Sequence, residues 1–175
     1  MRRRWGGSRG FTLPELLVAL AIVGMVLAAV TVLLEQGHKV YRAGAAKGEA
    51  QQSARVAVER LARELRAAGV NPTGARFSAL LNPTPTGFTI QNDLNGDGVI
   101  RGNRETITYS LTGHTLRRNA GGGAQPLIEG VESLTLTYLD GAGNAVETPD
   151  EVRAVVIAIT VGGVSMTTQV RLRNR

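Results

Sequence analysis

The feature that most restricts the fold is an uncharged apolar run over residues 16–34, LLVALAIVGMVLAAVTVLL, in which Thr31 is the only polar side chain. An α-helix over these 19 residues is roughly 28 Å long at ~1.5 Å per residue, close to the ~30 Å hydrocarbon core of a bilayer. The run is therefore long enough to span a membrane once.

Basic residues before the run outnumber those just after it. The first ten residues contain four arginines and no acid, whereas Lys39, Arg42 and Lys47 are spread over a longer stretch behind the run; the four are Arg2, Arg3, Arg4 and Arg9. Because positive loops stay on the cytoplasmic side, we expect a cytoplasmic N-terminus and an external remainder.

Two simpler interpretations also begin with a basic region and an apolar one: a secretory signal peptide and a plain signal anchor. A signal peptide has an apolar core of only ~7–15 residues and ends at a small-residue cleavage site. A plain anchor fits the hydropathy but does not explain why an acidic residue, Glu15, stands at the start of the apolar run.

Glu15 is costly at this position, because a carboxylate near mid-bilayer is unfavourable by at least ~2.5–3.5 kcal/mol, and by less toward the interface. No basic side chain lies between Gly10 and His38. Cleavage between Gly10 and Phe11 would create an α-amine about one helical turn from Glu15, available to its own Glu15 or to that of a neighbouring subunit. The same cleavage would place Pro14 among the first four amides of the helix, which have no intrahelical acceptor.

The segment GFTLPELLVALAIVG resembles the class III signal of type IV pilins and type II secretion pseudopilins. In that family a basic leader ends in Gly before Phe, the fifth mature residue is Glu, and a long hydrophobic helix follows. The resemblance implies cleavage after Gly10 by a prepilin peptidase, N-methylation of Phe11, and a role for Glu15 in methylation and subunit docking. Pro14 stands where the family more often has an aliphatic residue.

Beyond the span, small and apolar residues recur every three or four positions, which predicts one continuous helix over 11–68. Gly69, Asn71 and Pro72 then form a stop signal. Gly37, Gly44 and Gly48 are expected to weaken the middle of this helix. The apolar stripe consists of Val40, Ala43, Ala46, Ala50, Ala54, Ala57, Leu61, Leu65 and Ala68.

Residues 69–175 alternate β-like runs with turn signals, which predicts an antiparallel sheet packed on the second half of the helix and an α+β class. The firmest hairpin joins 152–161 to 164–172 across Gly162 and Gly163. The other expected strands are 88–91, 105–111, 114–118 and 133–139.

Three sequence segments of this head resemble W-type minor pilins and J-type type II secretion pseudopilins. They are ETITYSL, PLIEGVESLTLTYLDGAGN and VRAVVIAITV. Tip-type K pseudopilins usually lack the fifth-position glutamate, so Glu15 argues against that role. The resemblance implies partners: a major pilin, other minor pilins or pseudopilins, the prepilin peptidase and the inner-membrane assembly platform.

The segment NDLNGDGVIRGNRE has the spacing of a cation-binding loop. Oxygen donors at alternate positions converge on a hard cation such as calcium when a glycine permits the sharp turn. The twelfth position is Arg104 rather than an acid, so the ligand set is incomplete, and Asn-Gly and Asp-Gly, which are strong turn signals, favour a metal-free turn. The candidate ligands are Asp93, Asn95, Asp97, the Val99 carbonyl and Glu105.

Catalysis finds little support in the sequence. The chain has no cysteine, and His38 and His114 are far apart. Neither a Ser-His-Asp order nor a phosphate-binding loop is present. We therefore expect a non-enzymatic protein.

DNA uptake is the alternative function, since some pilin-like proteins serve it. The net charge of +6 suggests a polyanionic partner, but without the leader arginines 16 basic residues face 14 acidic ones, a net of +2. We therefore do not expect nucleic acid to be a partner. The arginines available for phosphate are Arg117, Arg118, Arg171, Arg173 and Arg175.

The expected organisation is a cleaved leader at 1–10, a pilin helix at 11–68 that spans the membrane at 16–34, and a β-rich head at 69–175. The expected function is that of a minor pilin or pseudopilin that joins or primes a type IV pilus or type II secretion filament. It would reside in the bacterial inner membrane, with its head in the periplasm, before it enters the filament.

Overall fold

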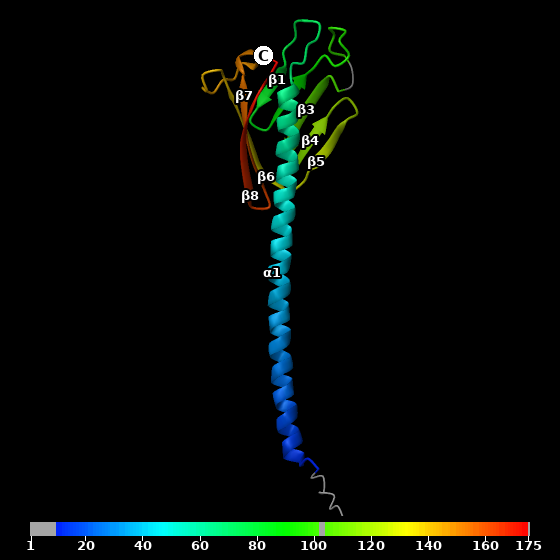
Figure 1. Cartoon of the computed structure of the whole chain (residues 1–175), viewed down its shortest axis with the longest axis vertical. Helices are drawn as coiled ribbons and strands as arrows, with labels where there is room; N and C mark the ends of the chain where they lie inside the picture. Colours follow the sequence, from blue (N-terminus) through cyan, green and yellow to red (C-terminus); the bar gives the residue numbers. More distant parts are fainter. Residues whose placement is uncertain (1–9, 102–103, 175) are drawn as a thin grey trace, which may run out of the picture. The chain divides into compact units, whose positions relative to one another are not determined.

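The computed structural model describes residues 10–101 and 104–174 (Figure 1). Arg2, Arg3, Arg4 and Arg9 of the expected leader therefore lie outside the described residues, as does Arg175. The chain divides into two compact units, residues 1–45 and 46–175, and each is considered by itself. One helix, α1 (Leu13–Ala67), contributes to both.

In the first unit, every described residue is exposed. Its apolar side chains point outward all round the helix, from Leu16 through Leu34, and α1 is long and apolar enough to cross a membrane. The helix continues through Gly24, Gly37 and Gly44. An all-round apolar surface on a helix is suited to lipid or to neighbouring apolar helices rather than to water.

The described residues of the second unit form two antiparallel sheets beside the C-terminal part of α1 (Figure 1). The first has the order β1-β2-β3-β4-β5 and the second the order β6-β7-β8. The strands of the first are β1 (Leu80–Thr84), β2 (Gly87–Gln91), β3 (Thr106–Thr112), β4 (Thr115–Asn119) and β5 (Ala124–Ile128). Those of the second are β6 (Val131–Leu139), β7 (Ala154–Val161) and β8 (Val164–Arg171), with a 3-10 turn η1 (Pro149–Glu151) before β7.

The α+β class, with a long helix packed by antiparallel strands, is confirmed. The expected hairpin closes across Gly162 and Gly163, which have φ values of 53° and 72°. Two strands were not predicted, β1 and β5. Both carry a proline, Pro83 and Pro126, and both lie at an edge of the first sheet, where a missing amide proton is tolerated.

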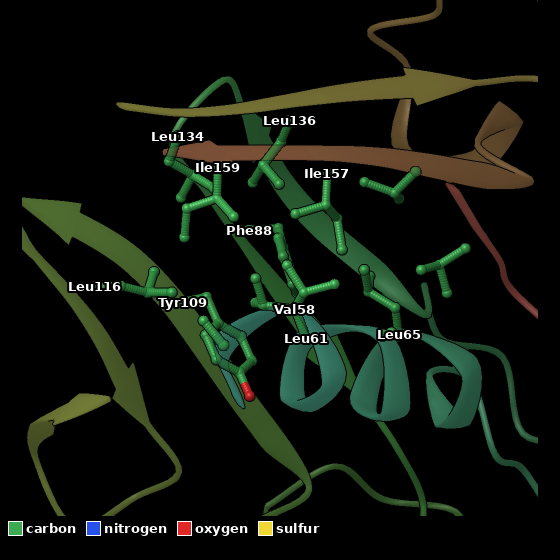
Figure 2. Close-up of a cluster of buried hydrophobic side chains, with 14 of the residues drawn as sticks. Val58, Leu61, Leu65, Phe88, Tyr109, Leu116, Leu134, Leu136, Ile157 and Ile159 are labelled. Carbon is green, nitrogen blue, oxygen red and sulfur yellow. The ribbon is translucent and has the colours of Figure 1, made fainter. Parts of the chain in front are cut away.

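The apolar stripe of α1 is buried from Ala50 onward, as its periodicity predicts. Its earlier members, Val40, Ala43 and Ala46, are exposed in this chain. Figure 2 shows Val58, Leu61 and Leu65 pointing toward side chains of both sheets, among them Phe88 and Ile157. The buried residues of α1 are Ala50, Ala54, Ala57, Val58, Leu61, Ala62 and Leu65.

The stop signal after α1 acts through Gly69. Its φ is 80°, and a Cβ at this position would lie 2.7 Å from the Ala79 Cβ and 2.8 Å from the Asn174 carbonyl oxygen. The Gly69 N–H donates to the carbonyl of Gln91 at 2.9 Å. Only glycine adopts this conformation in so little space, so the helix ends where the chain turns into the head.

A half-buried charged network ties α1 to the first sheet. The Glu64 carboxylate accepts hydrogen bonds from the Tyr109 hydroxyl at 2.6 Å, from Arg118 Nε at 3.0 and 3.1 Å, and from Arg60 Nε at 2.8 Å. Glu64 exposes only 12% of its side chain. Burial, and then the Glu64 carboxylate, raise the pKa of Tyr109 well above its usual value.

Replacing this carboxylate should weaken the head. Glu64→Ala leaves the buried Tyr109 hydroxyl and Arg118 without their acceptor, so we expect it to lower the free energy of unfolding by about 1–3 kcal/mol. Urea unfolding of the full chain in detergent measures this. The control is Glu59→Ala, which removes the exposed, solvent-screened pair with Arg55 and should lower the free energy of unfolding much less. Equal losses would show that the network adds nothing.

The raised pKa of Tyr109, and that of Tyr138, which burial also raises, predict a loss of stability at alkaline pH. A phenol whose folded pKa exceeds its unfolded value of about 10 stabilises the fold fully below that pH, and the contribution declines as the pH rises above it. Urea midpoints should therefore fall above pH ~10. Tyr109→Phe should flatten this decline, and an unchanged slope would contradict the assignment.

Candidate processing site at the start of the helix

The expected processing residues lie at and just before the first turn of α1. Gly10 and Phe11 precede the helix and are exposed, Phe11 by 81%. The helix begins at Leu13, later than the expected start at residue 11. Pro14 falls in the first turn, where its missing amide proton removes no intrahelical bond.

Glu15 caps this first turn. Its carboxylate Oε2 accepts from the backbone N–H of Thr12 at 3.2 Å and from the Thr12 hydroxyl at 3.2 Å. The Leu16 N–H donates to the Thr12 carbonyl at 3.1 Å, which closes the first helical hydrogen bond. In a capping box a glutamate three residues after the N-cap residue reaches back to that residue's N–H.

The sequence reasoning missed this cap, although its signal is present. Thr12-Leu13-Pro14-Glu15 is a Ser/Thr-x-x-Glu pattern before an apolar run, which marks a helix start. In the uncleaved chain residue 11 has an amide rather than an amine. The pairing of a Phe11 amine with Glu15 thus remains a prediction for the processed chain.

The other candidate site, the loop after β2, is closed by its own hydrogen bonds. Asp93 is fully buried; its Oδ1 accepts from Gly96 N–H at 2.8 Å and its Oδ2 from Gly98 N–H at 3.0 Å. Glu105 is also buried, and its carboxylate accepts from the N–H groups of Leu94 and Arg101.

The outer donors of this loop also bind one another. Asn95 Oδ1 accepts from Asp97 N–H at 3.0 Å, and Asp97 Oδ1 accepts from Val99 N–H at 2.7 Å. Across residues 10–101 and 104–174, no three His, Cys, Asp or Glu side chains gather as a metal site would need. Calcium binding by Asp93, Asn95, Asp97, Val99 and Glu105 stays an untested alternative to the metal-free turn.

Two of the arginines considered for phosphate binding already donate to other groups of this chain. Arg118 is engaged by Glu64, and Arg117 Nη1 donates to the Ala124 carbonyl at 3.4 Å. Arg171 and Arg173 are exposed near the end of the chain.

A calcium titration separates the two interpretations of the loop. Because backbone amides satisfy its carboxylates, we expect Tm of the full chain to stay constant on addition of millimolar calcium. Asp93→Ala, which removes the acceptor of Gly96 and Gly98, should lower Tm in either buffer. A rise in Tm with calcium but not with magnesium, lost in Asp93→Ala, would instead establish a cation site.

Comparisons with known proteins agree with the geometry of this helix start. A family model described as the prokaryotic N-terminal methylation motif matches residues 5–31. The chain is 27% identical over 197 aligned residues to the pilin-like protein PilA3 of Thermus thermophilus, covering 91% of this chain and 81% of that protein. With its methylation motif at the start of a long apolar helix and an antiparallel head behind it, the protein resembles the type IV pilins.

Proposed function

We propose that this chain is a structural minor pilin or pseudopilin that joins or primes the assembly of a type IV pilus or type II secretion filament. The observation that carries the proposal is the methylation motif over residues 5–31, with Glu15 at the first turn of an apolar helix. A prepilin peptidase cleaves after Gly10, and Phe11 becomes the N-methylated first residue. No catalytic step is assigned to the chain itself.

Lateral packing of apolar helices is the proposed mechanism of assembly. The side chains over residues 16–34 are exposed all round α1 in the isolated chain, so they require lipid or neighbouring helices. After cleavage the Phe11 amine lies about one turn from Glu15. The two charges then neutralise each other, within one subunit or between neighbours, and this pairing sets the register of packing.

The proposed topology follows from the basic leader and the single span. The N-terminus is cytoplasmic before cleavage, α1 crosses the inner membrane and the head lies in the periplasm. The partners are a major pilin, other minor pilins or pseudopilins, the prepilin peptidase and the inner-membrane assembly platform. Within this class we favour the W-type and J-type subunits, because three sequence segments of the head resemble theirs.

DNA uptake is a weaker alternative. It requires a cluster of free cations, whereas Arg118 is held by Glu64 and the processed chain has a net charge of only +2. Salt-dependent retardation of DNA by the processed full chain in detergent would favour this alternative.

Intact-mass spectrometry of the protein extracted from membranes of its native host tests the proposal. We expect a chain that begins at Phe11 and carries one extra methyl group on its N-terminal nitrogen, located by fragmentation. A chain that retains residues 1–10 would make this a signal-anchored protein and would overturn the proposal.

A variant pair assigns the role of Glu15. Glu15→Ala should still be cleaved, because Gly10 and Phe11 are intact, but should lose methylation and fail to enter filaments. Glu35→Ala removes a different carboxylate of the same helix and should retain both. If the two variants behave alike, Glu15 has no special role.

A further inference from the structure

In the described part of the chain, three of the four sheet edges carry features that hinder the addition of a further strand. In β1 the edge is interrupted by Pro83 and by a bulge at which Asn82 has a φ of 48°. In β5 the backbone N–H and C=O of Gln125 point toward Arg118 of β4. The backbone of the next residue, Pro126, therefore points away from the sheet, and proline has no N–H to offer there. Proline and bulges at edges are devices that prevent unwanted strand pairing.

The edge of β6 is partly occupied by hydrogen bonds to other segments. The Leu136 N–H, which points away from β7, donates to the Pro85 carbonyl at 2.8 Å. Further along, the Tyr138 carbonyl accepts from the Val146 N–H at 2.9 Å, and Leu139 forms an isolated bridge with Ala145. These contacts occupy the Leu136 N–H and the Tyr138 carbonyl, two of the groups that an added strand would need.

The fourth edge, β8, has none of these devices. The strand runs eight residues opposite β7 without a register shift, and it contains neither proline nor lysine. Because Val161 and Val164 flank a two-residue turn, they form a hydrogen-bonded pair, and the outward backbone groups belong to every second residue from Ser165. Within the described chain, no backbone partner meets these groups, which are those of Ser165, Thr167 and Gln169.

A basic groove lies beside this open edge. Its volume is about 310 Å³, and it is lined by Thr168 of β8 and by one face of α1. The α1 residues of the groove are the apolar Val58 and Ala62 and the charged Glu59, Arg63 and Arg66. Glu59 is paired with Arg55, whereas Arg63 and Arg66 are exposed and meet no carboxylate among the described residues.

We propose that β8 and this groove form a docking surface for an extended acidic segment of a partner protein, added as a further antiparallel or parallel strand. Backbone groups of Ser165, Thr167 and Gln169 pair with the segment. Side chains on one face of the segment enter the groove, where a carboxylate is paired by Arg63 or Arg66. The proposal does not depend on cleavage at Gly10.

The direct test is amide hydrogen exchange of the full chain in detergent. The probe is a fluorescein-labelled peptide in which valine and glutamate alternate, N-methylated along one edge so that it cannot pair with itself. On its addition, the N–H groups of Thr167 and Gln169 should become at least tenfold slower to exchange. Those of Met166 and Thr168, already bonded to β7, should change little. Absence of this alternating protection would overturn the proposal.

Fluorescence anisotropy with variants tests each part of the surface. Thr167→Pro removes an outward donor and should weaken peptide binding at least tenfold, while Thr167→Val keeps the donor and should bind normally. Arg63→Glu with Arg66→Glu should also weaken binding at least tenfold, and a peptide with lysine in place of glutamate should bind poorly to the unmodified chain.

The stability of each variant is measured by urea unfolding, so that loss of fold is not read as loss of binding. Equal affinity of the peptide for Thr167→Pro and Thr167→Val in folded protein would exclude β-addition. Equal affinity of the acidic and basic peptides would exclude the role of the groove. A failure of N-terminal processing, by contrast, would leave these results unchanged and would affect only the filament proposal.

Discussion

The structure depends on one helix that serves two environments. Over residues 16–34 its apolar side chains are exposed all round, whereas from Ala50 onward only one face is apolar and that face is buried by strands. The two patterns require different surroundings, because an all-round apolar surface must leave water and a one-sided stripe needs a single covering layer. The rest of the chain supplies that layer.

Small residues on α1 and the charged network of Glu64 determine how the strands pack on the helix. Ala50, Ala54 and Ala57 allow close approach; Ala50 lies so near the turn between β7 and β8 that a Cβ on Gly162 would be 2.6 Å from its Cβ. Glu64 binds Tyr109 and Arg118 from two adjacent strands. Apolar burial drives packing without direction, whereas these hydrogen bonds favour one placement of the first sheet on α1.

At the opposite end of the helix, Glu15 shows how one residue can meet two demands. In the unprocessed chain its carboxylate caps the first turn through Thr12, which satisfies an amide that has no intrahelical acceptor. The proposed α-amine of Phe11 would lie within the same turn. An acid in this place is thus compatible with a helix start both before and after cleavage, and Pro14 is tolerated for the same reason.

The sequence by itself determined the elements whose cause is local: the apolar span, the stripe that faces the sheets, the glycine stop after α1 and the hairpin at Gly162 and Gly163. It also contained the Thr12 and Glu15 cap, which went unrecognised. Only the tertiary structure decided that the strands divide into two sheets and that Pro83 and Pro126 lie in edge strands. It alone brought Glu64 to Arg118, and it left β8 open. These features depend on which strands become neighbours. Packing between residues far apart in the chain decides this, and the local periodicity of the sequence does not predict it.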